Sequence, residues 1–334
     1  MNDIRIAVSL SGMPRNFEQC YQNTLEFFNI DNAQVDFFIH CWSNHWYPKR
    51  TESKHNNSKT GKLLKEETLK KSLIKIYKPK HITVENQLLN IDLINTTKFI
   101  RDNLLRKTSK SRLTKWMIKI LESNDTDKFL SSPFHLAQVY SISRTANIIS
   151  KYEQDYDLVV RYRFDNYIEL RDKPWRTKMF HDMVNLIKHA EHRSLRAKKF
   201  HRDYLFVSWL TAMGECGFAR NTTWIGDKIF ACSKNKFADF SKYFQSQINR
   251  IITYDRVRCK NEDATFFMPE QTLYSMCLNN SFFAHSKGYL NKLSLLSYRD
   301  YHLELEQTFE ALQQEYIKRE KMNHDSAEGI VLGL

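Results

Sequence analysis

Apolar residues gather in short, nearly continuous runs, and polar residues follow each run. Three such runs lie at 5–10 (RIAVSL), 35–42 (VDFFIHCW) and 158–160 (LVV). Continuous apolar runs of this length are typical of parallel strands that are covered on both faces. We therefore expect three strands of a parallel sheet at these positions.

Between these runs, apolar residues recur at helical spacing. Helices are predicted over 16–29, 63–77, 135–152, 235–252, 269–279 and 308–322, and a basic amphipathic pattern covers 94–122. The basic segment 175–200 is interpreted as helical or loop-like. Further strands are predicted at 81–85, 205–209, 225–232 and 281–285. Strands that alternate with helices predict an α/β fold with a mainly parallel sheet.

The composition sets the domain organisation and the compartment. A chain of 334 residues, 42% of them hydrophobic, can build one large core, which we place at 1–295, followed by a helical tail at 296–334. No stretch approaches the roughly 18 to 20 apolar residues of a membrane span, and the first residues lack a signal-peptide layout. Six cysteines without a CxxC pair fit reduced thiols. We therefore expect a cytoplasmic protein.

The net charge of +13 is concentrated in two segments. Residues 43–122 hold 19 basic and 7 acidic residues (+12), and residues 171–202 hold 10 and 3 (+7), so the remainder is 13 − 12 − 7 = −6. A uniformly basic nucleic-acid module does not show this pattern. Two local basic faces suit an anionic membrane surface or an anionic acceptor.

Three charged residues, Arg161, Arg163 and Asp165, follow the third apolar run. They alternate with aromatic residues, so one interpretation is the solvated face of an edge strand. The other is a ligand site at the carboxyl end of a buried strand. There the carboxylate would hold Mg²⁺ or Mn²⁺, and the guanidiniums would neutralise a diphosphate.

The turn after the first apolar run is a second candidate. Ser11 and Gly12 are small enough for backbone N–H groups to approach a ligand, and Arg15 is placed to bind a phosphate where the next helix starts. A plain strand-to-helix turn is the alternative. Asp227, at the entrance of a predicted strand, is a third candidate.

Acids and a histidine in the last third of the chain are further candidates. Glu262, Asp263 and Glu270 could orient an acceptor hydroxyl or act as its general base, although Glu270 also suits a helix cap. His285, directly after an apolar run, is a candidate second metal ligand, with a structural role as the alternative.

Neither the dinucleotide fingerprint GxGxxG nor the phosphate loop GxxxxGK[ST] occurs. Five blocks in order nevertheless resemble those of bacterial glycosyltransferases that build capsule, O-antigen or lipopolysaccharide-core sugars. They are RIAVSLSGMPRNFEQCY, VDFFIHCWS, YDLVVRYRFDNYIEL, GDKIFACSKNKFADF and PEQTLYSMCLNN. The resemblance covers about 4–290, and its specificity lies in the order of the blocks.

The resemblance implies a GT-A-like fold with one Rossmann-type domain whose first half binds a nucleotide. The family's Asp-x-Asp motif is represented by Arg163-Phe164-Asp165, which lacks the first acid. By the same resemblance, Ser11, Gly12 and Arg15 fall on the nucleotide-binding turn. Asp227 falls where the family carries a carboxylate before a strand, and 269–271 starts an acceptor-side helix.

The expected function is transfer of a sugar from a nucleotide-diphosphate sugar to a growing surface glycan or lipid-linked glycan. Residues 43–122 form a basic, partly helical insertion that could cover the active site or lie against anionic lipid, two compatible roles, and we expect it to dock the protein on the inner face of the membrane. No nucleic-acid partner is expected. Two alternatives stay open: a nucleic-acid-binding protein that uses the basic segments, and a nucleotidyltransferase on a similar fold.

Overall fold

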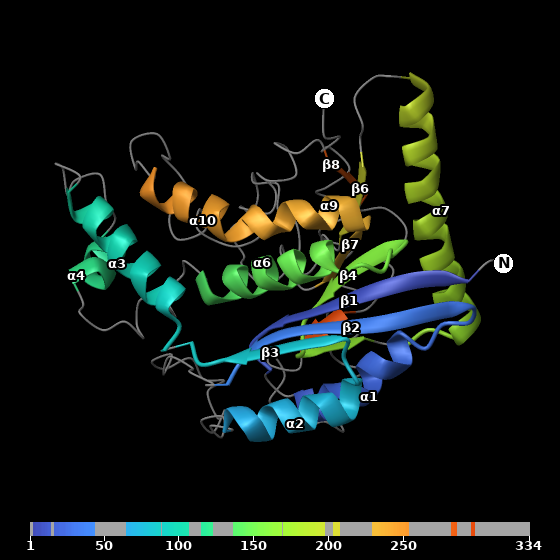
Figure 1. Ribbon diagram of the computed structural model, residues 1–334, viewed down its shortest axis with the longest axis horizontal. Coiled ribbons are helices and arrows are strands. Elements are labelled where there is room, and N and C mark those ends of the chain that lie inside the picture. The colour runs from blue at the N-terminus through green and yellow to red at the C-terminus, as the bar shows by residue number, and fades with distance from the viewer. Residues whose placement is uncertain are drawn as a thin grey trace, which may run out of the picture.

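The protein is a three-layer α/β structure in which helices cover both faces of one large sheet (Figure 1). The computed structural model describes the following residues: 3–14, 17–43, 65–87, 89–106, 115–122, 136–168, 170–197, 203–207, 229–253, 282–285 and 295–297.

The large sheet has seven strands in the order β3-β2-β1-β4-β7-β6-β8. The strands are β1 (Ile4–Gly12), β2 (Ala33–Trp42), β3 (His81–Glu85), β4 (Leu158–Tyr162), β6 (Asp203–Val207), β7 (Ile229–Cys232) and β8 (Phe282–His285). Only β7 runs against the others, antiparallel to both β4 and β6. The expected α/β fold with a mainly parallel sheet is confirmed, and the order β3-β2-β1-β4 is that of a Rossmann-type sheet. Two short strands, β5 (Asn166–Ile168) and β9 (Leu295–Ser297), form a separate antiparallel pair.

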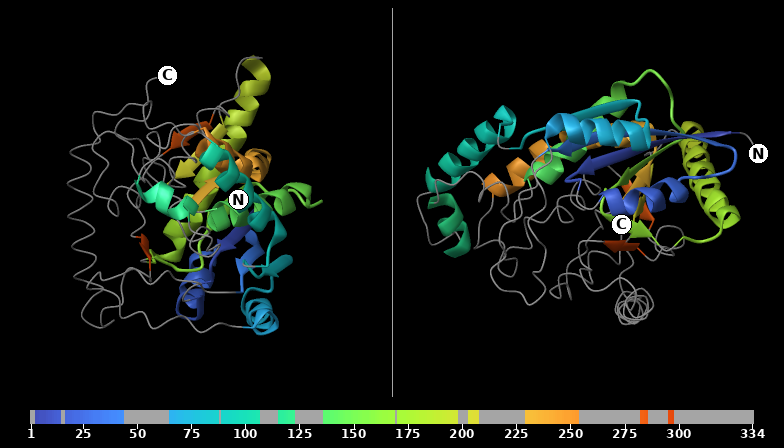
Figure 2. Two further views of the ribbon diagram at one scale, coloured as in Figure 1. Left: turned by 90° about the vertical axis from the view of Figure 1, so that its left-hand side faces the viewer. Right: turned by 90° about the horizontal axis from the view of Figure 1, so that it is seen from below.

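One face of the large sheet packs against α1 (Phe17–Phe27), α2 (Glu66–Tyr77) and α7 (Lys173–Ala197). The other face packs against α6 (Leu136–Lys151), which is backed by α9 (Lys234–Phe237), η2 (Ala238–Lys242) and α10 (Tyr243–Ile252). The helices α3 (Ile91–Arg106) and α4 (Lys115–Glu122) lie at the opposite end of the molecule from α7 (Figures 1 and 2). None of the described helices is long and apolar enough to cross a membrane.

Alternation along β1 explains the two faces. Ile6, Val8 and Leu10 belong to the core under α1, α2 and α7, whereas Ala7 belongs to the core under α6. Successive side chains of a strand point to opposite faces, so Ser9 and Ser11 lie on the α6 side as well. The first face is therefore wholly apolar at β1, and the second carries hydroxyl groups.

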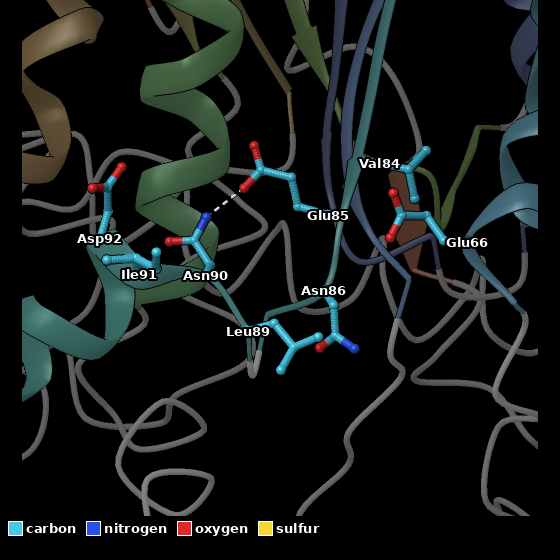
Figure 3. A pocket seen from close by; sticks show the side chains of 8 residues that line it. All are labelled: Glu66, Val84, Glu85, Asn86, Leu89, Asn90, Ile91 and Asp92. Atoms are coloured by element: carbon cyan, nitrogen blue, oxygen red, sulfur yellow. Dashed lines mark hydrogen bonds between the residues drawn. The ribbon is translucent and has the colours of Figure 1, made fainter.

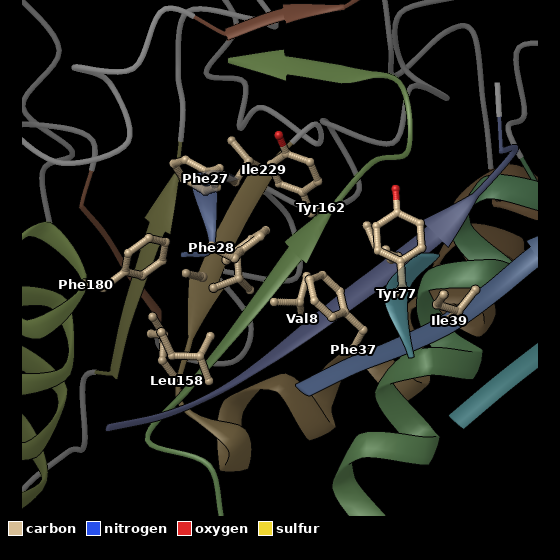
Figure 4. Close-up of a cluster of buried hydrophobic side chains, with 14 of the residues drawn as sticks. Val8, Phe27, Phe28, Phe37, Ile39, Tyr77, Leu158, Tyr162, Phe180 and Ile229 are labelled. Atoms are coloured by element: carbon tan, nitrogen blue, oxygen red, sulfur yellow. The ribbon is translucent and has the colours of Figure 1, made fainter. Parts of the chain in front are cut away.

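The core under α1 is rich in aromatic rings (Figure 4). Phe27 packs with its ring centroid 4.8 Å from that of Phe28, 5.9 Å from that of Tyr162 and 5.5 Å from that of Phe180. Because these rings come from α1, β4 and α7, the contact ties together segments that are far apart in the chain.

The core under α6 contains paired polar groups. Ser9 donates a hydrogen bond to Thr145 Oγ1 at 2.7 Å, and the Tyr156 hydroxyl donates to Asp36 at 3.0 Å. A buried polar group without a partner is costly, so such pairs are required wherever hydroxyls enter a core.

Several element predictions need correction. The turn predicted at Ser11 and Gly12 is instead the end of β1, which pairs with β2 as far as Gly12 and Cys41. The pattern over 94–122 is divided between α3 and α4, and 235–252 is divided among α9, η2 and α10. The strand β3 and the helix α2 lie within the basic segment 43–122 and belong to the central sheet and its helical layer. The helices predicted at 269–279 and 308–322 lie outside the described residues.

Candidate functional site

The strand order changes direction at β1. From β1 the chain adds β2 and then β3 on one side, and it later places β4 on the other side. In open α/β sheets, ligands bind beyond the carboxyl ends of the strands at such a switch point. Here the pairing of Leu10 with Tyr162 brings the ends of β1 and β4 side by side.

An ion pair stands at the end of β4. Arg163 binds both oxygens of the Asp165 carboxylate, from Nε to Oδ1 and from Nη2 to Oδ2, each at 2.8 Å. Asp165 is 1% exposed, and the side chain of Arg163 is 17% exposed. A two-pronged pair of this kind fixes the direction of both groups.

The interpretation of these charges as the solvated face of an edge strand is wrong. The strand β4 lies between β1 and β7, and Arg161 is fully buried. Arg161 pairs in register with Ser9 of β1 and therefore lies on the α6 side, as Val159 does. Its charge enters the interior rather than solvent.

The described part of this edge does not by itself fit a divalent cation. Both oxygens of Asp165 already accept hydrogen bonds from Arg163. Among the described residues, no three His, Cys, Asp or Glu side chains converge as metal ligands would. Mg²⁺ or Mn²⁺ thus stays a prediction, and here the arginine supplies the positive charge beside the carboxylate.

The end of β1 offers a hydroxyl rather than a free amide. Gly12 has a φ of +115°, a backbone conformation that L side chains rarely adopt. Its N–H donates to Ser141 Oγ of α6 at 2.7 Å, so it is already engaged inside the protein. Ser11 Oγ is buried and has no hydrogen-bond partner among the residues that the structure describes.

His40 of β2 links the end of β1 to β3, a connection that the sequence did not predict. His40 Nδ1 lies 2.8 Å from Ser141 Oγ, and its Nε2 lies 3.5 Å from Glu85 Oε1 at the end of β3. His40 is fully buried between the rings of Trp42 and Tyr140. Burial lowers the pKa of His40 because it disfavours the charged form, although Glu85 opposes this shift.

Glu85 reaches a pocket at the end of β3 (Figure 3). It accepts a hydrogen bond from Asn90 and lies 3.8 Å from Arg144. The interaction with the His40 imidazole, 3.5 Å away, contributes most to the lowered pKa of Glu85, so the group is a carboxylate at neutral pH. The pocket is lined by Glu66, Val84, Glu85, Asn86, Leu89, Asn90, Ile91 and Asp92.

Of the other predicted site residues, only His285 lies within the described residues. Arg15, Asp227, Glu262, Asp263 and Glu270 lie outside them. The chain enters β7 at the edge where β4 ends, because Ile229 pairs with Tyr162.

For His285 the structure gives the backbone position, as the last residue of β8. Three strand spacings, about 14 Å, separate β8 from β4. A metal ion held by both His285 and Asp165 would therefore have to join the ends of two strands that are separated by β7 and β6.

A signal for the missed residues was present in the sequence. His40 is a polar residue inside the apolar run VDFFIHCW, and Ala137, Ser141 and Thr145 repeat at intervals of four. That interval places small side chains on one helix face, which allows a helix to approach a sheet closely. Neither feature identifies its partner, since His40 and Ser141 are 101 residues apart.

No protein-family model matches the chain, and no curated protein matches it. Among solved structures, the chain is similar to the apo form of mouse xyloside xylosyltransferase 1, with a TM-score of 0.36 and 4% sequence identity. The match covers 86% of this chain and 85% of that chain. At this TM-score the likeness carries no argument about fold or activity.

Proposed function

We propose that the protein is a glycosyltransferase that uses a nucleotide-diphosphate sugar as donor. The observation that carries the proposal is the position of the Arg163–Asp165 pair at the switch point between β1 and β4. A guanidinium there suits the diphosphate group, and Asp165 fixes the direction of that guanidinium. The ordered sequence blocks that resemble bacterial glycosyltransferases support the same reaction class.

In the proposed reaction, the acceptor hydroxyl oxygen forms a bond with the anomeric carbon of the donor sugar. The bond from that carbon to the diphosphate oxygen breaks, and the nucleoside diphosphate leaves with the electron pair. Arg163 stabilises the charge that develops on this leaving group. The hydroxyl proton passes to a general base, for which Glu262, Asp263 and Glu270 stay the predicted candidates.

The proposed acceptor is a growing surface glycan or a lipid-linked glycan, reached from the cytoplasm at the inner face of the membrane. Besides the resemblance, the exposed side of α3 supports this proposal. Phe99 and Leu105 are 48% and 42% exposed, and Lys98 and Arg106 lie beside them in the sequence. Apolar and basic side chains together favour an anionic bilayer surface. Liposome binding that survives charge reversal of Arg106, Lys107, Lys110 and Arg112 would contradict the membrane contact.

A thermal-shift series tests the donor site. Purified full-length protein is heated with UDP-, GDP-, CMP- and dTDP-sugars, with and without Mn²⁺. One of the diphosphate classes, UDP-, GDP- or dTDP-sugars, is expected to raise the unfolding midpoint, because a ligand that binds the native state stabilises it. A rise with CMP-sugars alone would contradict a diphosphate donor. The rise should be lost in Arg163→Gln and Asp165→Asn.

Arg5→Gln is the matched control for Arg163→Gln. Arg5 is an exposed arginine near the amino end of β1, at the opposite edge of the sheet. It should keep the full midpoint rise. No rise with any nucleotide sugar, or an equal rise in Arg163→Gln, would contradict the proposal. Transfer of the nucleotide moiety instead of release of free nucleoside diphosphate would identify a nucleotidyltransferase.

A further inference from the structure

A chain of polar groups joins the end of β1 to the end of β3 through the interior. Gly12 N–H donates to Ser141 Oγ at 2.7 Å, Ser141 Oγ lies 2.8 Å from His40 Nδ1, and His40 Nε2 lies 3.5 Å from Glu85 Oε1. The first two distances are those of hydrogen bonds, and the third is mainly electrostatic. The chain thus runs from the switch point to a carboxylate that borders solvent.

Serine, histidine and glutamate are also the residue types of a nucleophilic triad, but this arrangement does not fit that chemistry. Ser141 is fully buried on α6, and its oxygen already accepts the Gly12 N–H. A nucleophile has to reach a substrate atom and requires a free lone pair directed at it. Ser141 therefore holds a backbone group in place.

The proton of Ser141 has two acceptors. Nδ1 of His40 lies 2.8 Å from Ser141 Oγ, and the backbone oxygen of His40 lies 2.9 Å from it. When His40 is neutral with its proton on Nε2, facing Glu85, Nδ1 accepts the Ser141 proton. The hydrogen bonds from Gly12 to Ser141 and from Ser141 to His40 then point the same way, which strengthens both, and the Nε2 proton lies on the side of the Glu85 carboxylate.

Protonation of His40 reverses the direction of the hydrogen bond between Ser141 Oγ and His40 Nδ1. Nδ1 then carries a proton and donates to Ser141 Oγ, so the Ser141 proton turns to the His40 backbone oxygen. Two donors, from Gly12 and His40, converge on one hydroxyl oxygen. The Gly12 amide therefore has a weaker acceptor in the acid form.

The charged and titratable groups that face His40 are few in the described structure. Glu85 of β3 favours its protonated form, whereas Arg144 of α6 disfavours it. His81 of β3 interacts with it electrostatically. The rings of Trp42 and Tyr140 also contact the imidazole, which is fully buried.

We propose that Glu85, His40 and Ser141 form a proton-sensitive chain that positions the Gly12 amide and thereby sets the affinity of the β1 end for a nucleoside diphosphate. The three are positioning residues, because none is argued to touch the ligand. The identity of the ligand rests on the proposed function, whereas the chain of polar groups from Gly12 to Glu85 does not.

The Gly12 amide can be observed alone. Ser11-Gly12 is the only Ser-Gly pair in a sequence with eight glycines. Full-length protein labelled with carbonyl-¹³C serine and ¹⁵N glycine therefore gives one Gly12 signal in a carbonyl-edited spectrum. The signal is followed from pH 8 to pH 4.5. We expect a step below the ordinary histidine value of 6.5, because burial lowers the pKa of His40.

The variants separate positioning from general stability. His40→Asn keeps a polar group beside Ser141 but does not titrate, so it should keep the folded signal and remove the step. Ser141→Ala should remove the step and weaken nucleotide affinity about tenfold, the scale of one hydrogen bond. Ser143→Ala is the matched control, since Ser143 on the same helix accepts the backbone N–H of Phe244 at 2.8 Å. It should leave both readouts unchanged.

The outcomes distinguish this inference from the proposed function. A Gly12 signal without a step in the wild type, or a step that persists in His40→Asn, overturns the proposal that His40 makes this chain of polar groups proton-sensitive. Nucleotide affinity that is unchanged or tighter in Ser141→Ala, or weakened equally in Ser143→Ala, overturns its positioning role alone. A wild-type protein that binds no nucleotide sugar contradicts the proposed function, whatever the Gly12 signal does.

Discussion

The two faces of the central sheet both carry apolar cores, but at β1 only the face under α6 also carries hydroxyl groups. Under α1 and α7, the contacts are made by rings such as those of Phe27, Tyr162 and Phe180. Under α6, hydroxyl groups such as Ser9 and Ser141 make hydrogen bonds inside the core. Both faces therefore provide apolar packing, and the face under α6 in addition brings hydrogen-bonded polar groups to the carboxyl edge.

The aromatic face should show the largest response to a single truncation. Phe27→Ala removes a fully buried ring that contacts Phe28, Tyr162 and Phe180. The expected loss is about 3–5 kcal/mol of unfolding free energy, from lost burial and the cavity left behind. Urea denaturation measures it, with Phe99→Ala, at a 48% exposed phenylalanine, as the control. A loss below that of the control would remove the basis of the comparison.

The face under α6 should make stability depend on pH. The pKa of His40 is lowered by burial, and that of Glu85 is lowered mainly by its interaction with His40. In both cases the unfolded chain binds protons more readily than the folded one. Stability from these groups is therefore present above their ordinary values of 6.5 and 4.5 and is lost as the pH falls.

Each proton contributes at most about 1.4 kcal/mol per pH unit to that loss. Unfolding midpoints measured from pH 8 to pH 5 should fall on acidification. The fall should be smaller in His40→Asn, because the substituted side chain takes up no proton in either state. Parallel curves for wild type and variant would show that His40 does not contribute.

A single hydroxyl of this face should have the smallest effect. Thr145→Val keeps the shape of the side chain but removes the acceptor of the Ser9 hydrogen bond. The expected cost is about 1 kcal/mol, because a buried hydroxyl is left without its partner. Thr68→Val, at an exposed position of α2, controls for the change of residue type and should stay within about 0.5 kcal/mol. Equal costs at the two positions would mean that the hydroxyl pair is not structurally significant.

Sequence patterns predict the framework well where burial acts on whole segments. The apolar runs that become β1, β2 and β4 are readable because both faces of these strands are covered. The same logic places Ser11, Gly12, Arg163 and Asp165 at strand ends. The parallel pairing of β1 with β4 then brings these ends together.

Features that depend on pairing across the chain cannot be read in this way. The reversed direction of β7 is set by its neighbours β4 and β6, and its four residues have no directional signal. The contact between His40 and Ser141 depends on how closely α6 approaches the sheet. The bond from Arg163 to Asp165 depends on the turn that ends β4, whereas an extended strand would hold the two side chains in parallel.

The engagement of the Gly12 amide by Ser141 also has a consequence over evolutionary time. A phosphate cradle built from main-chain amides is indifferent to most codon changes, because every residue except proline supplies the same N–H. At the described end of β1 this amide is engaged, and the partly exposed side chain of Arg163 is the group proposed to meet a ligand. A single nucleotide substitution can therefore alter what the edge recognises, and descendants of this chain could diverge in their ligands while keeping an identical backbone.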